Sequence, residues 1–104
     1  QYAELEQADQ VDFYNGLEGY YSVLGHNKKQ EAIAVLIEKN DHKIYVYQLD
    51  KGISQDKAAT ISREKGASDI DKITFGRYQD KPIWEVKSGN QYYLVDFETG
   101  AVIQ

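Results

Sequence analysis

The two histidines are the first residues to consider as metal ligands or acid–base groups. His26 lies beside Asn27 and His42 beside Asp41, each in a segment that we expect to form a turn. A metal site needs several ligands that converge at defined spacing, such as the two histidines of an HExxH helix, and the sequence contains no such arrangement. We therefore interpret both histidines as solvated turn residues and predict no metal site. Metal binding at His42 with Asp41 is the remaining alternative.

The carboxylates are plentiful, but no two of them are spaced as an acid–base pair. Glu85 and Asp96 each lie between two apolar residues, which is typical of a solvent-facing position on an amphipathic strand. The sequence also lacks cysteine, a phosphate-binding glycine loop, a dinucleotide-binding glycine pattern and a nucleophile elbow. We predict that the protein is not an enzyme and binds no cofactor.

Tyrosine is the residue type that could build a recognition surface. The chain has nine tyrosines, three phenylalanines and one tryptophan. Tyrosine is enriched at protein interfaces, and one member of each adjacent pair on a strand should face outward. The alternative is that the rings cover a thin sheet. Tyr78 and Trp84 flank the expected turn Gln79 to Pro82, and with the pair Tyr92 and Tyr93 they are our candidate partner-contact residues.

Length and charge restrict the kinds of protein and partner. A chain of 104 residues forms one domain or two closely packed units, because a unit of about 50 residues is marginal for burying a core. The net charge of −5 disfavours binding to nucleic acid or to anionic lipid. The longest apolar run, Ala32 to Ile37, is too short to cross a bilayer. Because the chain starts at Gln1 and has no Met, we expect a processed protein or a fragment that lacks an N-terminal anchor.

The second half of the chain looks like a rewritten copy of the first. Residues 20–27 followed by 31–37 can be laid over residues 83–90 followed by 91–97. In each half an apolar or aromatic strand enters a turn that contains Gly and Asn, and a second strand leaves it. This repeat predicts two units that share an interface.

The second unit begins with a well-marked helix. Ser54 is an N-cap residue and Gly66 supplies the left-handed position that ends such helices, so we expect a helix from Gln55 to Lys65. Beyond it the spacing changes to that of an antiparallel meander. We expect strands near residues 70–75, 83–87, 91–97 and 101–103, with a turn from Gly76 to Pro82.

The first unit has a weaker beginning. Tyr2, Leu5 and Ala8 form a short apolar stripe, which we interpret as the tail of a helix begun upstream. The run Ala32 to Ile37 lacks polar alternation, which predicts a strand covered on both faces at the centre of the core between the units. The strands of this unit are expected near residues 11–15, 19–24, 30–38 and 43–49.

Three segments together resemble a PepSY-type domain. They are Gly52-Ile53-Ser54 leading into the capped helix, the strand that contains Pro82-Ile83-Trp84-Glu85-Val86, and the stretch Tyr92 to Gly100. With a degenerate copy in front, which lacks the Pro-x-Trp pattern, the whole chain is similar to the YpmB family, or TseB-like domain, of Gram-positive bacteria. The resemblance implies an α+β fold of two tandem cystatin-like units, residues 1–50 and 51–104, each a helix packed on a small antiparallel sheet.

The same resemblance implies a function. Members of this family are non-catalytic, extracytoplasmic and held by an N-terminal membrane anchor, and they are associated with regulation of cell-wall elongation through contact with a penicillin-binding protein. We therefore expect a membrane-tethered protein-binding module. The alternative is a PepSY- or cystatin-like protease inhibitor or chaperone-like domain. Inhibition of that type would need an exposed wedge loop, for which Gly76 to Pro82 and Gly25 to Lys29 are the candidates.

Overall fold

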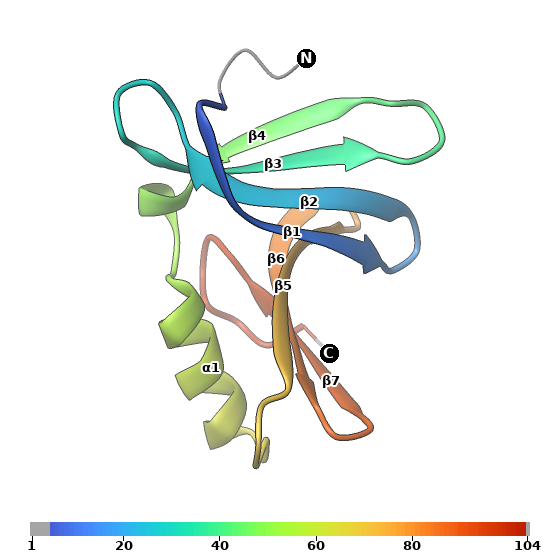
Figure 1. Ribbon diagram of the computed structural model, residues 1–104. Coiled ribbons are helices and arrows are strands. Elements are labelled where there is room, and N and C mark those ends of the chain that lie inside the picture. Colours follow the sequence, from blue (N-terminus) through green and yellow to red (C-terminus); the bar gives the residue numbers. More distant parts are fainter. Residues whose placement is uncertain (1–4, 104) are drawn as a thin grey trace.

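Two antiparallel sheets and one α-helix form the computed structural model shown in Figure 1, which describes residues 5–103. The first sheet has the strand order β1-β2-β3-β4 and the second has the order β5-β6-β7. Helix α1 precedes the second sheet in the chain and lies along it, while the strands of the first sheet run across its upper end (Figure 1). The strands of the first sheet are β1 (Gln7–Asn15), β2 (Gly19–His26), β3 (Ala32–Glu38) and β4 (Ile44–Gln48). They are followed by a 3₁₀ turn η1 (Leu49–Lys51) and the helix α1 (Gln55–Glu64). The strands of the second sheet are β5 (Lys72–Tyr78), β6 (Lys81–Ser88) and β7 (Gln91–Asp96).

The α+β class and the central helix were predicted correctly. The Ser54 hydroxyl accepts a hydrogen bond from the backbone amide of Lys57 at 3.0 Å, which satisfies a first-turn donor that has no partner within the helix. Gly66 adopts a φ of +117° just beyond the last turn. Local capping signals therefore define α1 to within one residue of its expected end.

The expected helical tail before the first sheet is wrong for the residues that can be checked. β1 starts at Gln7 and includes Ala8, while Leu5 packs beside the outer face of the sheet. Tyr2 lies outside the described residues. Residues 5–48 contain no helix, so the arrangement of one helix on each sheet is seen only for the second sheet.

The turn expected from Gly76 to Pro82 is much shorter in the structure. Gly76 belongs to β5, Pro82 belongs to β6, and Arg77 pairs with Pro82 across the two strands. Only Gln79 and Asp80 form the connection, with φ values of 50° and 67°. Two consecutive residues in the left-handed region make the tight hairpin turn that matches the twist of the strands, so β5 and β6 pair to their ends.

A single hydrophobic core joins the helix to both sheets. Phe75 lies at its centre, with edge-to-face contacts to Trp84 at 4.9 Å and Phe97 at 5.2 Å between ring centroids. Tyr47 of β4 approaches Phe75 to 5.7 Å from the first sheet. This core also contains Ala34, Leu36 and Ala58, so the two halves of the chain bury a common interface.

The apolar run of β3 is covered on both faces, as predicted. Ala34 and Leu36 point into the common core, whereas Ile33 and Val35 belong to a second cluster with Val23 on the opposite face. All four residues of the run from 33 to 36 are at most 1% exposed. The centre of the common core is Phe75 of β5 rather than this run, which contributes only two side chains to it.

The outer face of the first sheet carries two apolar rows that cross all four strands. One row runs Val11, Val23, Val35, Val46, and the other runs Phe13, Tyr21, Ile37, Ile44. The side chains on the two edge strands, together with Tyr21, are 40–66% exposed. No helix within the described residues covers this face, and α1 lies against the other sheet (Figure 1).

Candidate functional site

The cleft beside the second sheet is the candidate functional site. It has a volume of about 620 Å³, which is within the usual range of about 300–1,000 Å³ for ligand pockets. One wall comes from the end of β1 and the turn that follows it, and the other comes from the face of β5–β7 that turns away from α1. The lining residues are Phe13, Tyr14, Asn15, Gly16, Leu17, Lys72, Thr74, Tyr78, Glu85, Lys87, Tyr92 and Leu94.

Strand alternation decides which side chains of β6 reach the cleft. Trp84 points toward α1, and its indole Nε1 donates a hydrogen bond to the Ile53 carbonyl oxygen at 3.0 Å. Its neighbour Glu85 must point to the opposite face, where it lines the cleft between Thr74 and Leu94 on the adjoining strands. The helix and the cleft therefore occupy opposite faces of the same sheet.

Tyr14 forms the inner wall of the cleft because two glycines leave room for its ring. A Cβ atom at Gly76 would lie 2.5 Å from Tyr14 Cγ, and one at Gly16 would fall on the Tyr14 hydroxyl. The ring is only 1% exposed. A side chain at Gly76 would push Tyr14 out of this position, so the shape of the cleft depends on the close approach of β1 to β5.

Glu85 is a half-buried carboxylate in this cleft. Burial raises the pKa of Glu85 above its usual range, and the positive charge of Lys72 offsets this only in part. Burial, together with the nearby Glu85 carboxylate, also raises the pKa of the Tyr14 hydroxyl. Lys72 itself forms an ion pair with Asp12 at 3.1 Å. Glu85 accepts no hydrogen bond from any residue that the structure describes.

The four candidate contact residues divide between the two faces of the second sheet. Tyr78 and Tyr92 line the cleft, and Tyr92 is 52% exposed. Tyr93 is partly buried against the common core. Trp84 is 2% exposed and hydrogen-bonded inside that core, so its assignment to a contact surface is corrected. The reason is that the Trp84 face of β6 is the face that α1 covers.

The two carboxylates expected to face solvent are also placed differently. Glu85 is half-buried in the cleft, and Asp96 is 5% exposed. The Asp96 carboxylate accepts hydrogen bonds from the backbone amides of Glu98 at 2.8 Å and Thr99 at 3.1 Å, which fixes the turn after β7. Neither Glu85 nor Tyr14 was a candidate site residue, because the contact between β1 and β5 leaves no pattern in the sequence.

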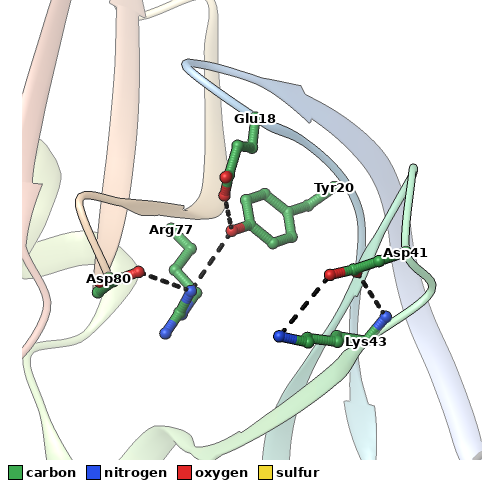
Figure 2. Close-up of polar contacts among 6 residues, drawn as sticks. All are labelled: Glu18, Tyr20, Asp41, Lys43, Arg77 and Asp80. Atoms are coloured by element: carbon green, nitrogen blue, oxygen red, sulfur yellow. Dashed lines mark hydrogen bonds and ion pairs between the residues drawn. The ribbon is translucent and has the colours of Figure 1, made fainter.

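Arg77, near the β5–β6 turn, holds the two sheets together (Figure 2). Its guanidinium lies 3.9 Å from the centroid of the Tyr45 ring, and Nε donates to the Tyr47 hydroxyl at 3.1 Å. Nη1 reaches the Tyr20 hydroxyl at 3.5 Å and the Asp80 carboxylate at 3.4 Å. Three of the nine tyrosines, Tyr20, Tyr45 and Tyr47, therefore have a structural role, because their contacts with Arg77 hold one sheet on the other.

The histidines do not form a cluster with other ligands. His26 is the last residue of β2, and its Nδ1 lies 2.8 Å from the Asp9 carboxylate. His42 sits in the β3–β4 connection with a φ of 62°. The adjacent Asp41 accepts a hydrogen bond from the Lys43 amide at 3.0 Å (Figure 2). Within residues 5–103 no three His, Cys, Asp or Glu side chains come together as metal ligands.

The two candidate wedge loops have little of the required shape. Gln79 and Asp80 alone connect β5 and β6. The loop from Gly25 to Lys29 is tied down by Asn27, whose side-chain oxygen accepts hydrogen bonds from the amides of Lys29 and Glu31, both at 2.9 Å. A short tight turn and a braced loop offer no long projection that could fill a protease cleft.

The fold and the site define a small α+β domain of two crossed antiparallel sheets, with a preformed cleft beside its helix-backed sheet. The chain is 37% identical over 109 residues to the "Probable cell wall elongation regulator TseB" of Bacillus subtilis (strain 168), an alignment that covers 97% of this chain and 67% of that protein. The solved structure of the YpmB protein from Bacillus subtilis superposes with a TM-score of 0.83 and 34% identity, covering 97% of this chain and 84% of that one.

A family profile described as "Cell wall elongation regulator TseB-like domain" matches residues 1–38. The chain belongs to this TseB-like family, and the similarity to the YpmB or TseB-like family seen in the sequence is confirmed. The profile match falls on the first half, which departs from the PepSY pattern. None of the described helices is long and apolar enough to span a membrane.

Proposed function

We propose that this protein is a non-enzymatic regulator that acts outside the cytoplasm, tethered to the membrane, and modulates cell-wall elongation by binding a penicillin-binding protein. The printed name of the Bacillus subtilis relative supports a role in regulating cell-wall elongation. The penicillin-binding protein, the tether and the location rest on the family resemblance in the sequence. The structural observation that carries binding is the cleft, a preformed surface feature built on a rigid two-sheet core.

The lining of the cleft favours recognition over catalysis. Among the described residues that line it, Glu85 is the only carboxylate and none is a histidine, serine or cysteine, while the one aliphatic hydroxyl, that of Thr74, belongs to a residue that is 5% exposed. The tyrosines Tyr14, Tyr78 and Tyr92 in its lining are of the residue type that is enriched in protein-binding surfaces. The exposed ring of Tyr92 provides contact area at little entropic cost, since it has only two side-chain torsions to fix.

We also propose that the chain consists of two tandem cystatin-like units, residues 1–50 and 51–104. The sequence repeat aligns Tyr21 and Val23 of β2 with Trp84 and Val86 of β6. These positions occupy the outer face of the first sheet and the helix-covered face of the second, respectively. The two faces differ in what covers them, but the aligned segments form an antiparallel hairpin in each unit, β2–β3 in the first and β6–β7 in the second, which supports an origin by duplication.

Capture from living cells tests the proposed partner. The protein, expressed from its own gene with an affinity tag, is crosslinked in growing cells and recovered for mass spectrometry. We expect a penicillin-binding protein to be enriched over a tagged, unrelated envelope protein. Recovery of no cell-wall synthase across repeated crosslinking conditions would refute the proposal.

Location is tested separately. Protoplasts are treated with an external protease, and a tag at the C-terminus of the protein is followed by immunoblot. Loss of the tag in intact protoplasts is expected, with a cytoplasmic protein protected in the same sample. A protected tag would place the domain on the cytoplasmic side and contradict the proposed site of action.

A further inference from the structure

The Glu85 carboxylate in the cleft makes no hydrogen bond or ion pair that would stabilise the fold within the described residues. Lys72, a cationic neighbour on its face, is already paired with Asp12 at 3.1 Å. No hydrogen bond or ion pair within the described residues reaches the Glu85 carboxylate. A partly desolvated carboxylate without a partner destabilises a fold, and such groups are retained where function needs them.

The cleft around Glu85 combines polar neighbours with exposed apolar side chains: Lys72, Thr74 and Lys87 lie on its face of the sheet, and apolar groups lie opposite and beside them. Leu17, in the turn after β1, is 70% exposed and Tyr92 is 52% exposed, and both line the same cleft as Glu85. Tyr78 is a further aromatic residue of the lining. A cationic group placed on Glu85 would therefore be attached to something that also covers apolar surface.

We propose that the cleft binds an extended peptide segment of the partner protein, with a Lys or Arg side chain of that segment against Glu85 and a neighbouring apolar side chain between Leu17 and Tyr92. This inference rests on the proposed function, because it assigns the chemistry of the partner's contact. Charge complementarity selects this occupant. A glycan strand built of hydroxyl and acetamido groups offers no cation to Glu85, whereas a basic peptide segment does.

Lys87 determines a second chemical feature that the bound peptide segment should have. It lines the cleft beside Tyr92, its cross-strand partner, and forms no ion pair with any described residue. A backbone carbonyl or an acidic side chain of the bound segment is the complement to its ammonium group. The preferred segment therefore contains one basic residue with apolar neighbours and carries a hydrogen-bond acceptor near one end. The net charge of −5 on this chain favours the approach of a basic peptide.

Selection from a peptide library tests the inference directly. The immobilised chain is panned against a library of random heptapeptides, in parallel with Glu85→Gln and with Glu98→Gln as a charge-matched control at an exposed position. We expect wild type and Glu98→Gln to enrich peptides that contain Lys or Arg next to Leu, Phe, Tyr or Trp. Glu85→Gln should lose the basic preference while remaining folded by circular dichroism.

One enriched peptide is then titrated into the ¹⁵N-labelled chain alongside the same peptide with its basic residue replaced by Gln. At least tenfold weaker binding of the Gln peptide, with amide shifts at residues 72, 85, 87 and 92, supports the inference. Equal binding of both peptides, an unchanged library result for Glu85→Gln, or shifts produced instead by an N-acetylglucosamine tetramer would overturn it. Enrichment of no peptide would overturn it as well, while leaving capture of a penicillin-binding protein as an independent result.

Discussion

The ring of Tyr14 lies directly against the backbone of Gly76, so that a Cβ atom at Gly76 would approach Tyr14 Cγ to 2.5 Å. This contact brings β1 of the first sheet onto β5 of the second and forms the inner wall of the cleft. We predict that Gly76→Ala lowers the free energy of unfolding by about 1–3 kcal/mol, because the buried ring has to move. Urea denaturation measures the change.

A double-mutant cycle separates this clash from a general effect of alanine at Gly76. In a Tyr14→Ala background, which removes the ring from Cγ outward, the Gly76→Ala change should be at least 0.5 kcal/mol less destabilising than in wild type, as expected for residues in direct contact, for which coupling is about 0.5–3 kcal/mol. Additive effects of the two substitutions would contradict the contact.

Replacement of Arg77 by Lys should loosen the two sheets. An ammonium group cannot stack on Tyr45 and at the same time donate in fixed directions to Tyr47 and Tyr20. We predict a loss of about 1–2 kcal/mol in the free energy of unfolding, which is the range for a partly desolvated cation–π contact with its hydrogen bonds. The same change at exposed Arg63 of α1 is the control, and a loss of equal size there would argue against a specific role for Arg77.

Glu85→Gln should stabilise the protein at neutral pH. Burial raises the pKa of Glu85 in the folded state, so folding favours the protonated form, and wild type loses stability as the pH rises from the unfolded-state pKa through the folded-state pKa. Glutamine does not ionise and avoids this loss. The variant should have a higher Tm than wild type at pH 7, with the difference closing below about pH 4. Glu98→Gln should show no such pH-dependent difference, and a lower Tm for Glu85→Gln at pH 7 would be the opposite of the expected sign.

Ser54→Ala should weaken the start of α1. The variant loses the acceptor of the 3.0 Å hydrogen bond from the Lys57 amide, and N-cap replacements of this kind destabilise by about 1 kcal/mol. For a domain of this size that corresponds to a fall of about 4–8 °C in Tm by scanning calorimetry. Thr60→Ala, at an exposed position in the middle of the helix, should leave Tm unchanged or raise it slightly.

The sequence was sufficient for the features that depend on near neighbours. The limits of α1 follow from Ser54 and Gly66, and the approximate positions of the seven strands follow from strand periodicity, the continuous apolar run of β3, and Gly- and Asn-bearing turns. The strand expected at residues 101–103 is only an isolated bridge between Val102 and Val95. The family could be inferred from motifs spread over the second half. These features could be predicted because capping, turns and strand periodicity are set by residues a few positions apart.

The cleft and the role of Trp84 could not be predicted in the same way. Alternation places Trp84 and Glu85 on opposite faces of β6 but does not say which face receives the helix, and the wrong choice assigned the tryptophan to a contact surface. The cleft itself depends on Tyr14 meeting Gly76, a contact between residues far apart in the chain. Leu5 and Ala8, the part of the apolar stripe that the structure describes, were misread as helical because apolar residues at such spacing are too few to exclude a strand.

Because Trp84 is buried, its intrinsic fluorescence can report on the folded state of the protein. It is the only tryptophan in the chain, and its indole is sealed between α1 and the second sheet. Its emission should be blue-shifted in the native state and move to longer wavelength when the helix separates from the sheet. Because Trp84 faces away from the cleft, a ligand bound there should leave this signal nearly unchanged. Fluorescence can thus follow unfolding of the helix-backed core while an independent measurement follows occupancy of the cleft.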